Sequence, residues 1–156
     1  MRPKRLEMQA FESYVGKTVI EFDKLGDSGL YLITGPTGSG KTTIFDAITF
    51  ALYGEASGDD RETNLLRTTG VDASVQTYVE LTFEYDGKEY RVRRTPQQER
   101  TKSRGSGVTN ESEKAELYLP GGEYESNRSI VNSKIKDIMR IDEKQFRQIA
   151  MIAQGD

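Results

Sequence analysis

A glycine-rich segment that ends in lysine and threonine constrains this chain more than any other feature. Residues 35–42 read GPTGSGKT and match the pattern GxxxxGK[ST]. Glycines at these places let backbone N–H groups turn inward around an anion, and a helix that starts at the end of the loop adds its positive dipole end. The pattern predicts a phosphate-binding loop between a strand and a helix.

The residues on both sides of the loop fit this requirement. Residues 30–34 form a nearly unbroken apolar run, which is typical of a strand buried on both faces. After the loop, apolar residues recur at three- and four-residue spacing and predict a helix from about Lys41 to a stop at Gly54. The alternative is a glycine-rich turn with an incidental lysine, and the strand-loop-helix context argues against it.

The loop also predicts roles for single side chains. Lys41 is expected to reach the terminal phosphates of a nucleotide, and the Thr42 hydroxyl is expected to ligate Mg²⁺. Thr43, one residue further into the helix, is positioned to donate to the α-phosphate. The other expected contacts come from the loop itself, at Gly35, Pro36, Thr37, Gly38, Ser39 and Gly40.

The side-chain inventory excludes several other chemistries. The 156 residues include no histidine, cysteine or tryptophan, so a Ser-His-Asp triad and structural zinc or iron-sulfur ligation are ruled out. The net charge of −3 gives no global field that would draw the chain onto nucleic acid or an anionic membrane. Because no apolar run approaches the ~18 residues of a membrane span, we expect a cytoplasmic protein with no membrane partner.

The remaining periodicity predicts a mixed α/β fold with an antiparallel β layer beside the strand-loop-helix unit. Residues 5–10 and 18–22 predict two antiparallel strands. Apolar residues alternate from 75 to 85, and Asp86-Gly87 then predicts a two-residue hairpin turn before a returning strand at 88–95. This turn would set Phe83 opposite Tyr90, Leu81 opposite Val92 and Glu80 opposite Arg93.

The C-terminal part predicts shorter elements. Residues 115–119 read as a short strand that ends at a Pro-Gly-Gly turn, and residues 130–139 carry apolar side chains on one helix face. Asp142 is expected to cap a further short turn. The apolar run 149–153 predicts a strand that ends at Gln154.

Residues 96–113 are polar and rich in Gln, Ser, Arg and Gly, which predicts an exposed and mobile loop. Between residues 91 and 104 the chain has six basic residues against one acidic residue, Glu99; the basic residues are Arg91, Arg93, Arg94, Arg100, Lys102 and Arg104. One interpretation of this concentration of positive charge is contact with DNA phosphates. The alternative is a solvated strand edge followed by a flexible loop.

The segment from residue 32 to residue 58, which contains the loop and its helix, strongly resembles the SbcC family. These proteins are bacterial SMC-like ABC ATPases of a double-strand-break repair nuclease. The resemblance extends to the predicted first strand, with Met8-Gln9-Ala10-Phe11, and to residues 13–18. It also includes the final residues 146–155, whereas we recognise no family motif in residues 96–128.

The resemblance implies a fold and a division of the chain. Residues 1–156 would form the N-terminal half of an ABC-type P-loop ATPase head, with the phosphate loop at 35–42 and a hairpin at 75–95. A flexible basic loop at 96–113 and the family's Q-loop at residue 154 would complete it. A long coiled coil and a C-terminal half that folds back onto this one are expected outside this sequence.

The resemblance further implies ATP and Mg²⁺ as cofactors. Gln154 would ligate Mg²⁺ together with Thr42 and help to place the hydrolytic water, so Lys41 and Gln154 are the expected catalytic residues. Ser13 would lie where the N-terminal segment approaches the nucleotide. Glu12 departs from the pattern, because some relatives carry an arginine at this place that points toward a phosphate.

The implied function is ATP-driven processing of DNA double-strand ends and hairpins in repair and recombination. The expected partners are an SbcD-like nuclease subunit, a second SbcC-like protomer, the C-terminal half of the same head, and double-stranded DNA. The chain has neither a Walker B Asp-Glu pair nor an LSGG signature, since Pro120 replaces the serine in residues 119–123. We therefore expect little ATP hydrolysis by these residues alone.

Two alternatives from other classes remain at this point. A self-contained kinase of a small metabolite would need an acceptor site and mobile arginines, for which residues 100–104 could form a lid. A nucleic-acid-binding module with a vestigial loop would bind DNA but would not be stabilised by nucleotide. The kinase alternative leaves the family-like residues 146–155 without an explanation.

Overall fold

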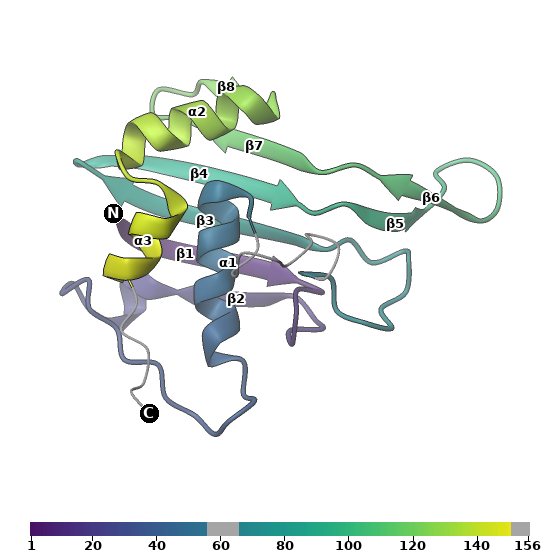
Figure 1. The fold of residues 1–156 in the computed structure, drawn as a ribbon, viewed down its shortest axis with the longest axis horizontal. Helices are drawn as coiled ribbons and strands as arrows, with labels where there is room; N and C mark the ends of the chain where they lie inside the picture. Colours follow the sequence, from purple (N-terminus) through teal and green to yellow (C-terminus); the bar gives the residue numbers. More distant parts are fainter. Residues whose placement is uncertain (56–65, 151–156) are drawn as a thin grey trace.

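An antiparallel sheet with α1 (Lys41–Tyr53) laid across one face forms the scaffold of the molecule (Figure 1). The computed structural model describes residues 1–55 and 66–150. The main sheet has the strand order β2-β1-β3-β4-β7-β8, and every neighbouring pair is antiparallel. Its strands are β1 (Arg2–Gln9), β2 (Thr18–Glu21), β3 (Tyr78–Tyr85), β4 (Lys88–Thr95), β7 (Lys114–Tyr118) and β8 (Tyr124–Glu125).

The other elements lie around this sheet. They are the 3₁₀ helix η1 (Phe22–Leu25), the hairpin strands β5 (Gln98–Thr101) and β6 (Val108–Glu111), and the helices α2 (Arg128–Met139) and α3 (Glu143–Ala150). Helix α2 packs along β7 near one edge of the sheet, and α3 lies beside α1 (Figure 1). None of the helices in the described part of the chain is long and apolar enough to cross a membrane.

The predicted strand pairs are confirmed. β1 and β2 pair antiparallel, and β3 returns as β4 through Asp86 and Gly87. These two residues have φ values of 51° and 72°, which is the positive-φ pair of a type I′ turn. The turn fixes the register, so Phe83 lies opposite Tyr90, Leu81 opposite Val92 and Glu80 opposite Arg93. β3 begins at Tyr78, three residues later than the alternation suggested.

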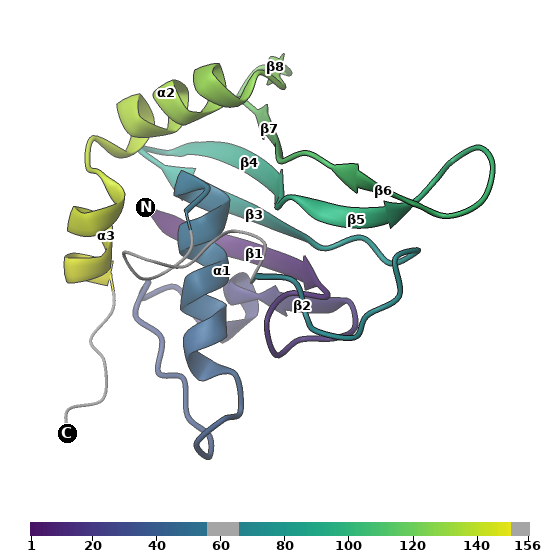
Figure 2. The same cartoon turned by 45° about the vertical axis from the view of Figure 1, so that its right-hand side comes forward.

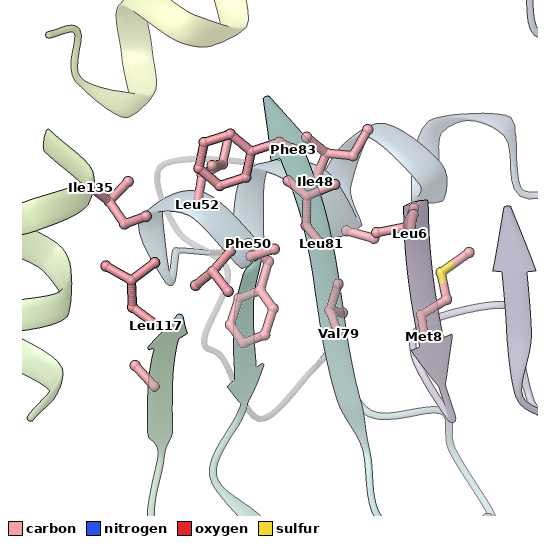
Figure 3. Packing of buried hydrophobic residues seen from close by; sticks show 14 of the residues in the cluster. Leu6, Met8, Ile48, Phe50, Leu52, Val79, Leu81, Phe83, Leu117 and Ile135 are labelled. Carbon is pink, nitrogen blue, oxygen red and sulfur yellow. The ribbon is translucent and has the colours of Figure 1, made fainter. Parts of the chain in front are cut away.

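A shared apolar layer holds α1 on the sheet (Figure 3). Burial of one large apolar side chain contributes roughly 1.5–3 kcal/mol, so a layer of this kind fixes the helix firmly. The start of α1, where the glycine loop ends, is thereby held at one place relative to β1. The labelled members of the layer are Leu6, Met8, Ile48, Phe50, Leu52, Val79, Leu81, Phe83, Leu117 and Ile135.

The ends of the helices agree in part with the sequence. Gly54 ends α1 in the left-handed conformation with φ 74°, as predicted. Asp142 caps α3, because its carboxylate accepts from the Gln145 N–H at 2.8 Å and the Gln145 side chain accepts from the Asp142 N–H at 2.9 Å. The predicted strand at 149–153 is wrong at its start, since Ile149 belongs to α3. Residues 151–153 lie outside the described residues.

The predicted strand at residues 30–34 does not form. Leu30 and Leu32 are 82% and 89% exposed, although the apolar run suggested burial on both faces. A strand is stable only when other strands pair with its edges, and no strand in the described part of the chain pairs with this run. The apolar sequence is therefore present without the partners that would bury it.

The predicted loop at 96–113 is exposed as expected, but the absence of strands is wrong, because β5 and β6 form an antiparallel hairpin there (Figure 2). The hairpin extends past the end of the main sheet. Its residues pair from Gln98 opposite Glu111 to Thr101 opposite Val108. Most of its side chains are exposed, so the strands lack the alternation of polar and apolar residues that would have revealed them.

Candidate nucleotide-binding site

The glycine loop leads directly into the first turn of α1. Gly40 is the N-cap residue with φ 83°, and Gly38 has φ 80°, so both adopt a conformation that glycine tolerates best. Gly40 has no side chain to cap the first N–H groups, and the first turn contains no acidic residue. The positive end of the helix therefore faces the loop without being neutralised by the cap, which suits an anion.

The loop is closed so tightly that two of its glycines have no room for a side chain. A Cβ at Gly35 would lie 2.7 Å from Ser39 Oγ, and a Cβ at Gly40 would lie 2.8 Å from Ser13 Oγ and 2.9 Å from Tyr14 Cε2. Such distances are shorter than any normal contact. Gly35 therefore lets the loop close on its own residue Ser39, and Gly40 lets the turn that carries Ser13 and Tyr14 pack directly against the end of the loop.

Lys41 lies over this loop. Its Nζ donates to Gly35 O at 2.6 Å and to Pro36 O at 2.8 Å. An ammonium group has three donors on a flexible stem, so it can exchange carbonyl partners for the oxygens of a phosphate. Lys41 therefore lies against the glycine loop, and its predicted contact with the terminal phosphates stays a prediction.

The turn between β1 and β2 packs against the loop. Ser13 Oγ lies 3.2 Å from Thr43 Oγ1, and the Tyr14 hydroxyl donates to Gly40 O at 3.3 Å. Ala10 and Glu12 near this turn have positive φ values of 48° and 45°, which is unusual for residues other than glycine. The structure therefore brings Ser13 to the loop, as the family resemblance implied.

Thr43 has a partner that the sequence did not reveal. Its buried hydroxyl donates to Glu12 Oε2 at 2.9 Å, across 31 residues of sequence. The only signal in the sequence was the departure from arginine at residue 12. Thr42, in contrast, is exposed at the start of α1, where its hydroxyl is open to a ligand.

The metal site is described only in part. Gln154 lies outside the described residues, so its predicted approach to Thr42 stays a prediction. Among residues 1–55 and 66–150, no group of three or more Asp, Glu, His or Cys residues is placed to hold a metal ion. The Thr42 hydroxyl and the open loop fit a Mg²⁺ ion that takes most of its ligands from phosphate and water.

The basic residues from 91 to 104 do not form one cationic surface. Arg94 is buried, and its guanidinium donates to Ala51 O at 2.8 Å and Leu52 O at 2.9 Å, at the C-terminal end of α1. Burial lowers the pKa of Arg94 to about 10, which leaves it charged at neutral pH. Arg100 donates to Ala73 O at 3.0 Å and pairs with a carboxylate on β6.

Arg91 and Arg93 share the face of β4 opposite to Arg94, and both lie over aromatic rings. Arg93 stacks 3.7 Å over the ring of Tyr78, and Arg91 lies 4.0 Å over the ring of Tyr118. The predicted patch is thus divided among the core, these aromatic partners and the β5–β6 hairpin. Exposed basic residues of the hairpin turn are Lys102 and Arg104.

A buried carboxylate lies beside one of these rings. The Tyr78 hydroxyl donates to Glu7, which also pairs with Arg5 and Lys17. Burial favours a raised pKa for Glu7, but hydrogen bonds from these three partners outweigh it and lower the pKa to about 2. Glu7 is therefore ionised at neutral pH. It lies on β1, the strand that leads into the turn that packs against the glycine loop.

Comparison with known proteins agrees with this geometry. A model of the AAA domain family matches residues 5–156, and the chain belongs to this family of P-loop proteins. A solved structure from work on the ATP-driven dimerization and DNA-stimulated activation of SMC ATPases aligns with a TM-score of 0.58 at 23% identity. The alignment covers 100% of this chain and 88% of that one. At this identity the match concerns the fold alone, and it confirms the predicted ATPase-head fold.

Curated relatives are more specific. The chain is 41% identical to the SbcC subunit of the SbcCD nuclease of Vibrio cholerae, over 99% of this chain and 16% of that protein. It is 35% identical to the SbcC subunit of the Lactococcus lactis nuclease, over 100% of this chain and 15% of that protein. The predicted resemblance to the SbcC family is confirmed, and the chain spans about a sixth of the length of these relatives. Neither relative is described as a kinase, so the small-metabolite kinase gains no support.

Proposed function

We propose that this chain is the nucleotide-binding part of an SbcC-like ATPase that acts with a partner nuclease on DNA ends in repair and recombination. The observation that carries this proposal is the open start of α1. There a closed glycine loop, a lysine and two hydroxyls converge on one place. Membership of the AAA domain family and the similarity to SbcC proteins support ATP as the nucleotide.

The proposed roles follow the positions of the side chains. Residues 35–40 hold the phosphates through backbone N–H groups, and Lys41 moves from the loop carbonyls to the terminal phosphates. Ser13 and Thr43 offer hydroxyls to the α-phosphate. Thr42 and Gln154 hold Mg²⁺, which when bound neutralises charge on the phosphate oxygens.

We further propose that the exposed run at residues 30–34 pairs with strands of the C-terminal half of the head. Leaving Leu30 and Leu32 in water is unfavourable, and pairing would bury both while ordering the chain that enters the loop. The Walker B glutamate and the signature serine would come from the C-terminal half and from a second protomer. The SbcD-like nuclease and double-stranded DNA are the proposed partners of that larger assembly.

The proposal is tested with the full-length natural protein and with the chain of residues 1–156. In the full-length protein, Lys41→Ala is expected to abolish Mg-ATP binding and hydrolysis, because no other cation of the described residues donates to the loop carbonyls. The matched control is Lys24→Ala, which removes an exposed lysine that pairs with Glu21. Calorimetric titration and phosphate release measure the two activities.

Two outcomes would contradict the proposal. One is Mg-ATP binding that Lys41→Ala leaves unchanged. The other is steady ATP hydrolysis by residues 1–156 alone that is lost in Lys41→Ala, because this result would place the catalytic groups within these residues. A screen for phosphoryl transfer to small acceptors distinguishes a kinase from the proposed ATPase.

A further inference from the structure

We propose that Glu12 limits nucleotide affinity by competing with a bound phosphate for the hydroxyl hydrogen of Thr43. The inference rests on the proposed function, because it assigns residue 12 a role at the same loop. The Thr43 hydroxyl donates to Glu12 Oε2 at 2.9 Å and lies 3.2 Å from Ser13 Oγ. A threonine hydroxyl has one hydrogen, so it cannot donate to Glu12 and to a phosphate at the same time.

The three side chains form a hydrogen-bonded chain with one direction. Because Thr43 gives its hydrogen to Glu12, its oxygen is left to accept from the Ser13 hydroxyl. Both hydroxyls then direct their hydrogens toward the carboxylate. A phosphate at the loop receives a hydrogen from Thr43 only if Thr43 gives up its bond to Glu12, which is a charge-assisted hydrogen bond.

The backbone holds Glu12 in this place. Its N–H donates to Leu66 O at 2.7 Å, and its carbonyl accepts from the Thr68 hydroxyl at 2.8 Å. The φ of 45° is unfavourable for a residue with a side chain, and such conformations persist where the surroundings determine them. Glu12 therefore stays beside the start of α1 when the loop is occupied.

Charge acts in the same direction as the hydrogen bond. The start of a helix favours a negative group, and Glu12 brings a carboxylate to Thr43 in the first turn of α1. A phosphate bound at the loop would lie near a like charge, which is unfavourable. The substitution Glu12→Gln removes this repulsion and leaves a weaker acceptor for the Thr43 hydroxyl.

The experiment measures Mg-ATP dissociation constants by calorimetry in the full-length natural protein. The variants are Glu12→Gln, Thr43→Val and the double substitution, with Glu123→Gln in an exposed turn as the matched control. We expect Glu12→Gln to tighten binding about five- to tenfold, since it weakens one charge-assisted hydrogen bond. In the Thr43→Val background the gain should fall below about twofold, because no hydroxyl remains to compete for and only the smaller effect of removing the charge repulsion is left.

Each outcome has one meaning. An unchanged or weaker affinity of Glu12→Gln overturns the inference, and so does an equal gain in both backgrounds, which would indicate general electrostatics. Lys41→Ala, measured in the same series, reports on the proposed function. If Lys41→Ala abolishes binding while Glu12→Gln does not tighten it, the competition fails and the nucleotide site stands. If Lys41→Ala has no effect, the proposed function fails.

Discussion

The two ends of α1 differ in whether a side chain of the protein caps their free backbone groups. At the C-terminal end, the buried Arg94 donates to the carbonyls of Ala51 and Leu52 and places positive charge where the helix dipole is negative. At the N-terminal end, Gly40 offers no capping side chain, and Lys41 donates to carbonyls of the loop. The chain thus caps the carbonyls at one end of the helix with its own side chain and leaves the N–H groups at the other end without a side-chain cap.

The starts of the other two helices sharpen this contrast. The Asn127 side chain accepts from the N–H groups of Ser129 and Ile130 at the start of α2. Asp142 and Gln145 cap the start of α3 reciprocally. Among the α-helices of the described residues, the one that follows the glycine loop starts without a side-chain cap, which indicates a place kept for an external anion.

The largest expected loss of stability comes from removing the arginine that caps the C-terminal end of α1. Arg94→Met should lower the free energy of unfolding by about 2–4 kcal/mol, because two carbonyls lose a charged donor inside the core. Chemical denaturation measures this loss. Arg93→Met is the matched control on the same strand, where the arginine is partly exposed and stacks on Tyr78, and it should cost under about 1 kcal/mol. Equal losses in the two variants would show that Arg94 does not close the helix.

The next largest effect is expected from adding a side chain at Gly40, at the N-terminal end of α1. Gly40→Ala should lower the free energy of unfolding by about 2–3 kcal/mol, because it combines a positive φ with a Cβ only 2.8 Å from Ser13 Oγ. It should also abolish nucleotide-dependent thermal stabilisation in Mg²⁺, which a melting series with and without Mg-ATP measures.

Gly105→Ala provides the control for this substitution. Gly105 has the same φ of 83° at the tip of the β5–β6 hairpin, but no atom lies within 4 Å of its added Cβ. It should therefore cost about 1 kcal/mol for the backbone alone and leave nucleotide binding unchanged. If both variants behave alike, the close packing of Ser13 and Tyr14 on the loop has no importance for the site.

Local signals in the sequence predicted much of this fold. The Asp86-Gly87 turn set the register of β3 and β4 because hairpin geometry depends on two residues alone. The glycine loop and its helix were also predicted, because the loop motif, the apolar spacing and the stop at Gly54 are all local in the sequence. Arg94 could also have been recognised as buried, because it lies two residues after Val92 and so shares its inward face.

Features that depend on distant partners could not be predicted. Glu12 and Thr43 meet across 31 residues, and neither residue type signals the other. The apolar run at 30–34 suggested burial, but burial also depends on strands that pair with it, and Leu32 is exposed here. In the β5–β6 hairpin, most side chains face solvent, so hydrophobic periodicity carried no information.

The smallest expected effect comes from opening a helix start that the chain closes itself. Asn127→Ala removes the acceptor for two N–H groups of α2 and should lower the free energy of unfolding by about 1 kcal/mol. Since α2 does not follow the glycine loop, Mg-ATP should stabilise this variant against heat as much as it stabilises the wild type. A loss of that nucleotide-dependent stabilisation in Asn127→Ala would contradict the distinction between closed helix starts, which serve stability, and the open start of α1, which binds the ligand.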